Sequence, residues 1–172
     1  KILESPIEGC ITRNKNGEMQ YSIPSIRIKT LDEIPSPYTS GLLDEFFDGK
    51  LSPMFQTNRG CPFTCSFCVD GTDTVRQVNN FGMNRIISDL NYIAEHVPSN
   101  THSLFISDLN FGMIPRDIEI CKILAKLKDT HGFPKQIQAT TGKNSKERII
   151  KAIKELHGDR KSTRLNSSHQ II

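Results

Sequence analysis

The segment "NRIISDLNYIAEHVPSNTHSLFIS" (residues 84–107) joins the two local patterns that decide the fold. Its first part repeats apolar residues three and four positions apart, which is typical of an amphipathic helix. Its last part (102–107) is a short apolar run with the length of a buried strand. A helix followed directly by a strand predicts an α/β protein. The residues expected on the buried face of the helix are Ile86, Ile87, Leu90, Ile93, Ala94 and Val97.

The same alternation extends in both directions along the chain. "PMFQTN" (53–58) predicts a strand before this helix, and "KQIQAT" (135–140) predicts a third strand. Pro115 predicts the start of a second helix, because proline is favoured in the first turn. The residues expected in the buried stripe of that second helix include Cys121, Leu124 and Leu127.

A third helix is predicted from "NSKERIIKAIKEL" (144–156). Asn144 and Glu147 have the spacing of a capping box, in which two side chains satisfy free amides at the start of a helix. The residues expected to point inward are Ile149, Ile150, Ile153 and Leu156.

Three strand–helix units predict parallel strands joined by right-handed crossovers. A closed (β/α) barrel needs about eight such units in roughly 250 residues. We therefore expect an α/β fold that is a truncated, partial TIM-like barrel, with the third strand left as an open edge. The chain begins at Lys1 and not at Met, which indicates a piece of a longer protein.

A β-hairpin and a linker are expected before the first unit. In "GCITRNKNGEMQYS" (9–22), Asn16-Gly17 predicts a type I′ turn between two strands. Pro35 and Pro37 oppose a long helix in the following segment, where one short helix is expected around residues 42–47. The expected division is hairpin and linker over 1–52, the α/β domain over 53–158, and a non-native or disordered tail over 159–172.

Composition excludes several classes of function. The 172 residues carry a formal charge of only +3, with no basic stripe that would indicate nucleic-acid binding. No run approaches the ~18 apolar residues of a membrane span, and no signal peptide is visible at the start. Five cysteines, an odd number, do not suggest a disulfide framework, so reduced thiols in the cytoplasm are expected.

Three of the five cysteines lie in "RGCPFTCSFC" (59–68), with the spacing C-x3-C-x2-C. A structural zinc site would need a fourth ligand, usually from a second pair of cysteines or histidines, and none follows. A ferredoxin cluster would use C-x2-C-x2-C with a fourth cysteine. We therefore favour an iron–sulfur cluster that Cys61, Cys65 and Cys68 ligate, with one iron left open. A non-catalytic iron–sulfur or zinc-binding structural module and a plain βα interaction domain remain the alternatives.

"CPFTCSFC" (61–68) resembles the signature of the radical S-adenosylmethionine superfamily. "LDEIPSPY" (31–38) and "QTNRGCPFTCSFC" (56–68) resemble the subgroup in which a cobalamin-binding domain precedes the radical domain through a hairpin and linker. "FISDLNFGM" (105–113) resembles the end of the second strand in that subgroup, although Leu109 stands where a second acidic residue is common. The resemblance covers about residues 9–156.

This resemblance implies a [4Fe–4S] cluster on Cys61, Cys65 and Cys68, with S-adenosylmethionine on the fourth iron. Reductive cleavage of that cofactor would give a 5′-deoxyadenosyl radical. The implied partners are an electron donor such as flavodoxin or ferredoxin and a small-molecule substrate of unknown identity. Cobalamin would bind to a domain before Lys1. The substrate, the reaction type and the catalytic residues are not predicted.

The resemblance also implies contacts to S-adenosylmethionine. Phe67 would present its backbone to the adenine, and Asp108 would hold the methionine ammonium group, with Asn110 close by. Since functional groups of (β/α) barrels collect at the carboxyl ends of strands, Thr140, Thr141 and Lys143 after the third strand are expected on the same rim. Of these three residues, Thr140 is the candidate cofactor contact.

Overall fold

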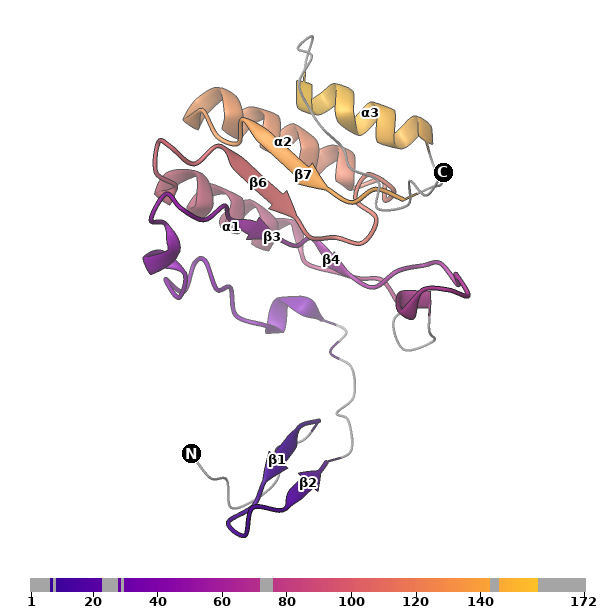
Figure 1. The fold of residues 1–172 in the computed structure, drawn as a ribbon. Helices are drawn as coiled ribbons and strands as arrows, with labels where there is room; N and C mark the ends of the chain where they lie inside the picture. The colour runs from indigo at the N-terminus through magenta and orange to yellow at the C-terminus, as the bar shows by residue number, and fades with distance from the viewer. Residues whose placement is uncertain are drawn as a thin grey trace.

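The computed structural model describes residues 7, 9–22, 28, 30–71, 76–142 and 146–157. The α/β unit contains a parallel sheet in the order β3-β6-β7 (Figure 1), formed by Met54–Phe55, Ser103–Ile106 and Gln136–Ala139. Phe55 pairs with Ile106, and Leu104 pairs with Ile137. The three strands therefore follow chain order in one parallel sheet, as the sequence predicted, and the fold class is α/β.

Three helices connect and cover these strands. They are α1 (Met83–His96), α2 (Asp117–His131) and α3 (Lys146–His157), and each follows one strand of the sheet. The second helix begins two residues after Pro115, so the proline lies just before the first turn. Asn144 lies outside the described residues, so the capping box stays a prediction.

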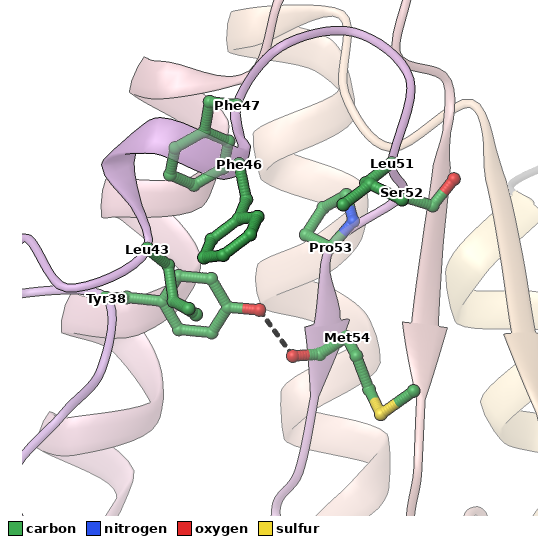
Figure 2. A pocket seen from close by; sticks show the side chains of 8 residues that line it. All are labelled: Tyr38, Leu43, Phe46, Phe47, Leu51, Ser52, Pro53 and Met54. Carbon is green, nitrogen blue, oxygen red and sulfur yellow. Dashed lines mark hydrogen bonds between the residues drawn. The ribbon is translucent and has the colours of Figure 1, made fainter.

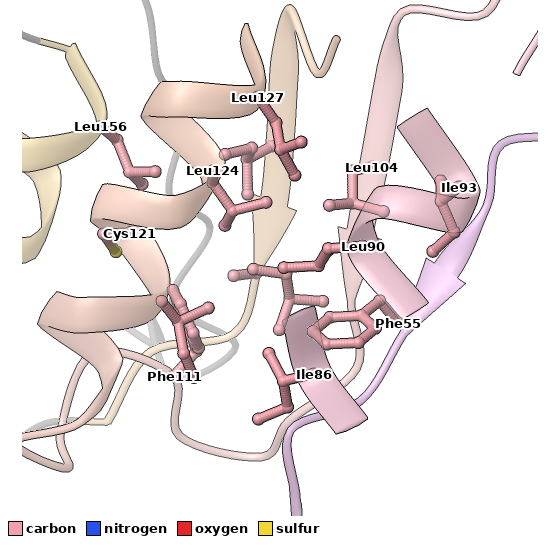
Figure 3. Packing of buried hydrophobic residues seen from close by; sticks show 14 of the residues in the cluster. Phe55, Ile86, Leu90, Ile93, Leu104, Phe111, Cys121, Leu124, Leu127 and Leu156 are labelled. Atoms are coloured by element: carbon pink, nitrogen blue, oxygen red, sulfur yellow. The ribbon is translucent and has the colours of Figure 1, made fainter. Parts of the chain in front are cut away.

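The hydrophobic core lies between the sheet and the helices (Figure 3). Ile86, Leu90 and Ile93 of α1 are almost fully buried, as are Leu104 and Ile106 of β6. The predicted stripe of α2 is confirmed, because its residues Cys121, Leu124 and Leu127 are also buried. Burial raises the pKa of the Cys121 thiol to about 12, so this cysteine packs as a small apolar residue.

Two residues predicted to point inward are instead exposed. Ile87 of α1 is 36% exposed, and Ile150 of α3 is 52% exposed. Ala152 and Leu156 form the buried face of α3, which packs on α2. Each helix buries only one face against the core. An isoleucine at the border of that apolar face can therefore remain exposed to water.

The hairpin is confirmed, but its turn differs from the prediction. β1 (Ile11–Arg13) pairs antiparallel with β2 (Met19–Tyr21). The amide of Gly17 donates to the carbonyl of Asn14 at 3.0 Å, and the amide of Asn14 donates to the carbonyl of Glu18 at 3.0 Å. Gly17, with φ of 83°, is therefore the last residue of the turn and not its third, as a type I′ turn at Asn16-Gly17 would require. The side chain of Asn14 accepts hydrogen bonds from two backbone amides of the loop, which favours the wider turn.

Polar contacts tie the segment before β3 to the α/β unit. Asp32 accepts both of its hydrogen bonds from the amide of Gly82, at the start of α1. Ser36 donates to Asp89 of α1 at 2.5 Å, and the guanidinium of Arg85 in α1 donates to the carbonyl of Ile34 at 2.8 Å. This segment is mainly irregular, with the short 3-10 turns η1 (Leu31–Glu33) and η2 (Asp44–Phe46), the second of which matches the short helix expected near residues 42–47.

An apolar hollow lies beside the edge strand β3 (Figure 2). It is lined by Tyr38, Leu43, Phe46, Phe47, Leu51, Ser52, Pro53 and Met54. The hydroxyl of Tyr38 donates to the carbonyl of Met54, and burial raises the pKa of this tyrosine to about 12. The linker thereby covers part of an edge that β-strands otherwise leave open.

A substitution pair tests the buried face of α1. We expect Leu90→Ala to lower the free energy of unfolding by about 2–5 kcal/mol, because it opens a cavity in the core. Ile87→Ala, one helical turn earlier and exposed, should cost less than about 1 kcal/mol. Urea unfolding followed by circular dichroism measures both, and equal losses would contradict the assignment of Ile87 to the surface.

Candidate functional site: the carboxyl ends of the parallel strands

The residues singled out in the sequence follow the carboxyl ends of the three parallel strands (Figure 1). The cysteine loop comes after β3, Asp108 and Asn110 come after β6, and Thr140 and Thr141 come after β7. Because the three strands are parallel, these segments all follow the same edge of the sheet, as the sequence predicted.

A short antiparallel pair that the sequence analysis missed closes the base of the cysteine loop. β4 (Asn58–Arg59) pairs with β5 (Asn79–Asn80), and the amide of Phe81 donates to the carbonyl of Thr57 at 3.0 Å. Gly60 follows β4 with a φ of 115°, a conformation that glycine tolerates best. The residues before and after the cysteine loop are therefore adjacent in the fold.

The three motif cysteines are free thiols with different burial. Cys61 is 9% exposed, whereas Cys65 and Cys68 are half-buried. The amide of Cys68 donates to the carbonyl of Cys65 at 3.1 Å, so these two residues share one tight turn. Such a set of reduced thiols on one short loop suits a soft metal or an iron–sulfur cluster in its donor chemistry.

The sulfur atoms are not gathered in this conformation. Within the described ranges, no group of three Cys, His, Asp or Glu side chains is close enough to hold a metal ion. Cys61 is fixed next to β4, while the thiol of Cys68 lies 3.8 Å from the carboxylate of Asp70.

Asp108 is buried and holds the residues that lead into the cysteine loop. It is 1% exposed, and its Oδ1 accepts a hydrogen bond from the amide of Thr57 at 2.7 Å. Its Oδ2 accepts from the hydroxyl of Thr57 and, at 2.8 Å, from Nδ2 of Asn58. Both carboxylate oxygens are thus used within the protein, and the side chain contacts the start of β4.

Opposing effects act on the charge of Asp108. Burial raises its pKa above the usual value, and this is the largest influence. The hydrogen bonds from Thr57 and Asn58 and the positive charge of Arg116 lower the pKa. The net effect is a raised pKa, so burial outweighs the donors and favours the neutral form more than water would.

Asn110, a predicted cofactor contact, has its side chain next to a cysteine of the loop. Its Nδ2 lies 3.2 Å from the Sγ of Cys61. The next residue, Phe111, donates its amide to the carbonyl of Thr140 at 2.8 Å, which connects the ends of β6 and β7. Cys61, Asn110 and Thr140 thus belong to one continuous set of contacts.

Asp117 and Arg148 hold the rest of the segment 110–114. Oδ2 of Asp117 accepts hydrogen bonds from the amides of Gly112 at 2.8 Å and Ile114 at 2.9 Å. The guanidinium of Arg148 donates to the carbonyl of Met113. Burial raises the pKa of Asp117 to about 6, and the nearby Asp108 adds to this increase.

The remaining predicted residues have simpler surroundings. The side chain of Phe67 is 74% exposed, Thr140 is half-buried and Thr141 is buried. Lys143 lies outside the described residues. The sequence analysis missed Thr57, Asn58 and Asp117; an acidic residue in the first turn of a helix was a usable signal for Asp117 only.

Curated proteins are similar in sequence to most of this chain. The chain is 35% identical over 140 residues to 2-(S-pantetheinyl)-carbapenam-3-carboxylate methyltransferase of Streptantibioticus cattleyicolor, covering 78% of this chain and 20% of that protein. It is 34% identical over 137 residues to the cobalamin-dependent radical SAM methyltransferase TokK of Streptomyces tokunonensis, covering 76% of this chain and 20% of TokK. No family model matches. The chain thus spans about a fifth of the length of these curated relatives.

Solved structures share the fold. The cobalamin-dependent S-adenosylmethionine radical enzyme OxsB with aqua-cobalamin bound superposes with a TM-score of 0.54 at 16% identity, over 86% of this chain and 22% of that one. The radical S-adenosylmethionine methyltransferase TsrM of Kitasatospora setae, with cobalamin and a [4Fe–4S] cluster bound, gives a TM-score of 0.52 at 11% identity, over 69% and 21%.

The fold and the cysteine loop place this chain among α/β proteins with a thiol-rich loop at the carboxyl end of a parallel sheet. Together with its relatives, they show that the chain belongs to the radical S-adenosylmethionine superfamily, in the subgroup associated with cobalamin. None of the helices in the described residues is long and apolar enough to cross a membrane.

Replacing Asp108 tests its role as a structural acceptor. Asp108→Ala leaves the amide and the hydroxyl of Thr57 without their acceptor in a dry site, so we expect the free energy of unfolding to fall by about 3–5 kcal/mol. Asp129→Ala, at an exposed position of α2, should change it by about 0.5 kcal/mol or less. Chemical unfolding checks both, and a loss below about 1 kcal/mol in Asp108→Ala would contradict the role.

Asp117 predicts a pH dependence of stability. Its pKa of about 6 in the folded chain exceeds the ordinary value of 3.8, so the folded state binds the proton more tightly than the unfolded state. The stabilisation is complete below about pH 4 and is lost as the pH rises through 6, and it amounts to about 3 kcal/mol. Asp117→Asn keeps the acceptor oxygen but cannot titrate.

The difference in unfolding free energy between Asp117→Asn and the unmodified chain should therefore grow in favour of the variant between about pH 4 and pH 7. Urea titrations across this range measure that difference. A constant difference would show that Asp117 has an ordinary pKa.

Proposed function

We propose that this chain forms the cluster-binding part of a radical S-adenosylmethionine enzyme. Cys61, Cys65 and Cys68 would ligate three irons of a [4Fe–4S] cluster, and S-adenosylmethionine would bind to the fourth. The observation that carries this proposal is the C-x3-C-x2-C set of free thiols at the carboxyl end of the parallel sheet. The names of TokK and TsrM support it, since both are radical S-adenosylmethionine methyltransferases.

The bound cluster would supply one electron for cleavage of S-adenosylmethionine to methionine and a 5′-deoxyadenosyl radical. The contribution of the chain is to hold and shield this chemistry. Cys61 is already buried and contacts the side chain of Asn110, which would fix one corner of the site. Cys65 and Cys68, which share one turn, would complete the ligand set.

The cofactor contacts implied by the resemblance are part of the proposal. The backbone at Phe67 would face the adenine, and Asn110 and Thr140 would line the cofactor site. Asp108 was expected to hold the methionine ammonium group, but its two oxygens already accept hydrogen bonds from Thr57 and Asn58. We propose that Asp108 acts on the site by fixing the start of the cysteine loop.

The larger setting is proposed from the relatives. The three strand–helix units would be the first units of a partial (β/α) barrel spanning residues 53–158, with the hairpin and linker of 1–52 leading in from a cobalamin-binding domain. A ferredoxin- or flavodoxin-like protein in the cytoplasm would supply the electron. Methyl transfer is the reaction that the names of the two curated relatives favour.

Anaerobic reconstitution with iron and sulfide tests the cluster. We expect a brown protein with about four irons and four sulfides per chain, whose electron paramagnetic resonance spectrum in the reduced state changes on addition of S-adenosylmethionine. Cys61→Ser, Cys65→Ser and Cys68→Ser should each lose most of the iron. Cys10→Ser, at an exposed position, and Cys121→Ser, at a buried one, are matched controls that should retain it.

Other results would identify the alternatives. A colourless protein with one tightly held zinc would indicate a structural metal module. A brown protein that does not respond to S-adenosylmethionine would indicate a non-catalytic iron–sulfur module. A metal content that Cys65→Ser leaves unchanged would indicate an α/β domain whose cysteines bind no metal.

A further inference from the structure

The contact between Asn110 and Cys61 joins two segments that are 49 residues apart in the sequence. Cys61 is the most buried of the three motif cysteines, and the amide nitrogen of Asn110 lies 3.2 Å from its sulfur. Hydrogen bonds in such a water-poor place are electrostatically stronger than those exposed to solvent. The contact therefore has a larger effect at this sulfur than it would have on the half-buried thiols.

Asn110 is held in place independently of the cysteine loop. The segment that follows it is fixed by Asp117, by Arg148 and by the carbonyl of Thr140, none of which belongs to the loop. The amide thus points at Cys61 from a separate, well-anchored part of the fold. When the cluster binds, the ligand sulfur meets a donor that is already positioned.

The direction of the hydrogen bond follows from the chemistry of the sulfur. A cysteine bound to iron is a thiolate and carries no proton, so it can only accept, and the Asn110 amide is the donor. A hydrogen bond to a cluster sulfur stabilises added negative charge, and reduction potentials of clusters depend on such bonds. The bond therefore stabilises the reduced cluster more than the oxidised one.

We propose that Asn110 is a positioning residue that fixes Cys61 and makes the cluster easier to reduce. The step concerned is the transfer of one electron from a ferredoxin- or flavodoxin-like donor, or from dithionite in vitro, to the cluster, whose core charge falls from 2+ to 1+. No bond is formed or broken in this step. The inference rests on the proposed function, because it needs Cys61 to be a cluster ligand.

Redox titration of the reconstituted chain, monitored by electron paramagnetic resonance, tests the inference. Asn110→Leu removes the donor at similar size, and Asn110→Asp replaces it with a negative charge beside the sulfur. We expect the midpoint potential to become more negative in Asn110→Leu and more negative still in Asn110→Asp. Asn84→Leu, at an exposed position in the first turn of α1, is the control and should leave the potential unchanged.

A second measurement uses the unmodified chain, so that the inference can be tested even if the Asn110 variants take up no iron. The chain is labelled with 15N in its asparagine side chains, and the reduced cluster is examined by pulsed electron paramagnetic resonance without S-adenosylmethionine. A 15N hyperfine coupling to the cluster supports the inference.

The possible failures are distinguishable. If the unmodified chain binds no cluster, the proposed function fails and this inference fails with it. If the cluster forms but shows no 15N coupling, or if Asn110→Leu retains both its iron and the unmodified potential, only the inference is overturned.

Discussion

The buried carboxylate of Asp108 is the interaction on which the site depends. It lies beyond the end of β6 and accepts hydrogen bonds from Thr57 and Asn58, beyond the end of β3. β3 pairs with β6 over only two residues, so regular strand pairing fixes this edge of the sheet weakly. Beyond the last strand pair, the carboxylate of Asp108 joins the chain after β6 to the chain after β3. It thereby fixes the position at which the cysteine loop begins. A buried charge is costly unless its donors are in place, so Asp108 favours this one arrangement of the two strand ends.

Two further sets of contacts hold the segments around Asp108. On one side, the linker is fastened to α1 through Asp32 and Ser36, and to β3 through Tyr38, so the edge strand is held from outside. On the other side, Asp117 and Arg148 fix the segment that carries Asn110. The cysteine loop is closed at its base by β4 and β5. Cys61 receives the side chain of Asn110, whereas Cys65 and Cys68 share a tight turn of their own.

Much of the fold could be predicted because it depends on local periodicity. The helices α1 and α2 and the strands β6 and β7 have clear apolar patterns, and their order requires a parallel sheet. The exposure of Ile87 and Ile150 could not be predicted, because the apolar pattern of a helix does not show which residues at its borders contact the core. The pair β4–β5 was missed because its asparagines have low strand propensity, and it forms only when the ends of a long loop return to one place.

The candidate site divides in the same way. The cysteine spacing and the position of Asp108 after a strand can be seen in the sequence, and both lie where the strand order predicts. The hydrogen-bond partners of Asp108 depend on the register of β3 against β6, which no local pattern contains. Asn110 was expected near the cofactor, but its contact with the sulfur of Cys61 depends on the path of the segment that Asp117 holds. Long-range contacts of this kind decide what each polar residue does.

The central claim is that three cysteines of this chain hold a four-iron cluster whose fourth iron takes S-adenosylmethionine. Mössbauer spectroscopy of the 57Fe-reconstituted chain, with and without S-adenosylmethionine, tests it most directly. The account predicts that one iron in about four changes its isomer shift when the cofactor is added, because only that iron gains new ligands. Four irons with unchanged parameters would mean that every corner of the cluster is already occupied, and would contradict the account.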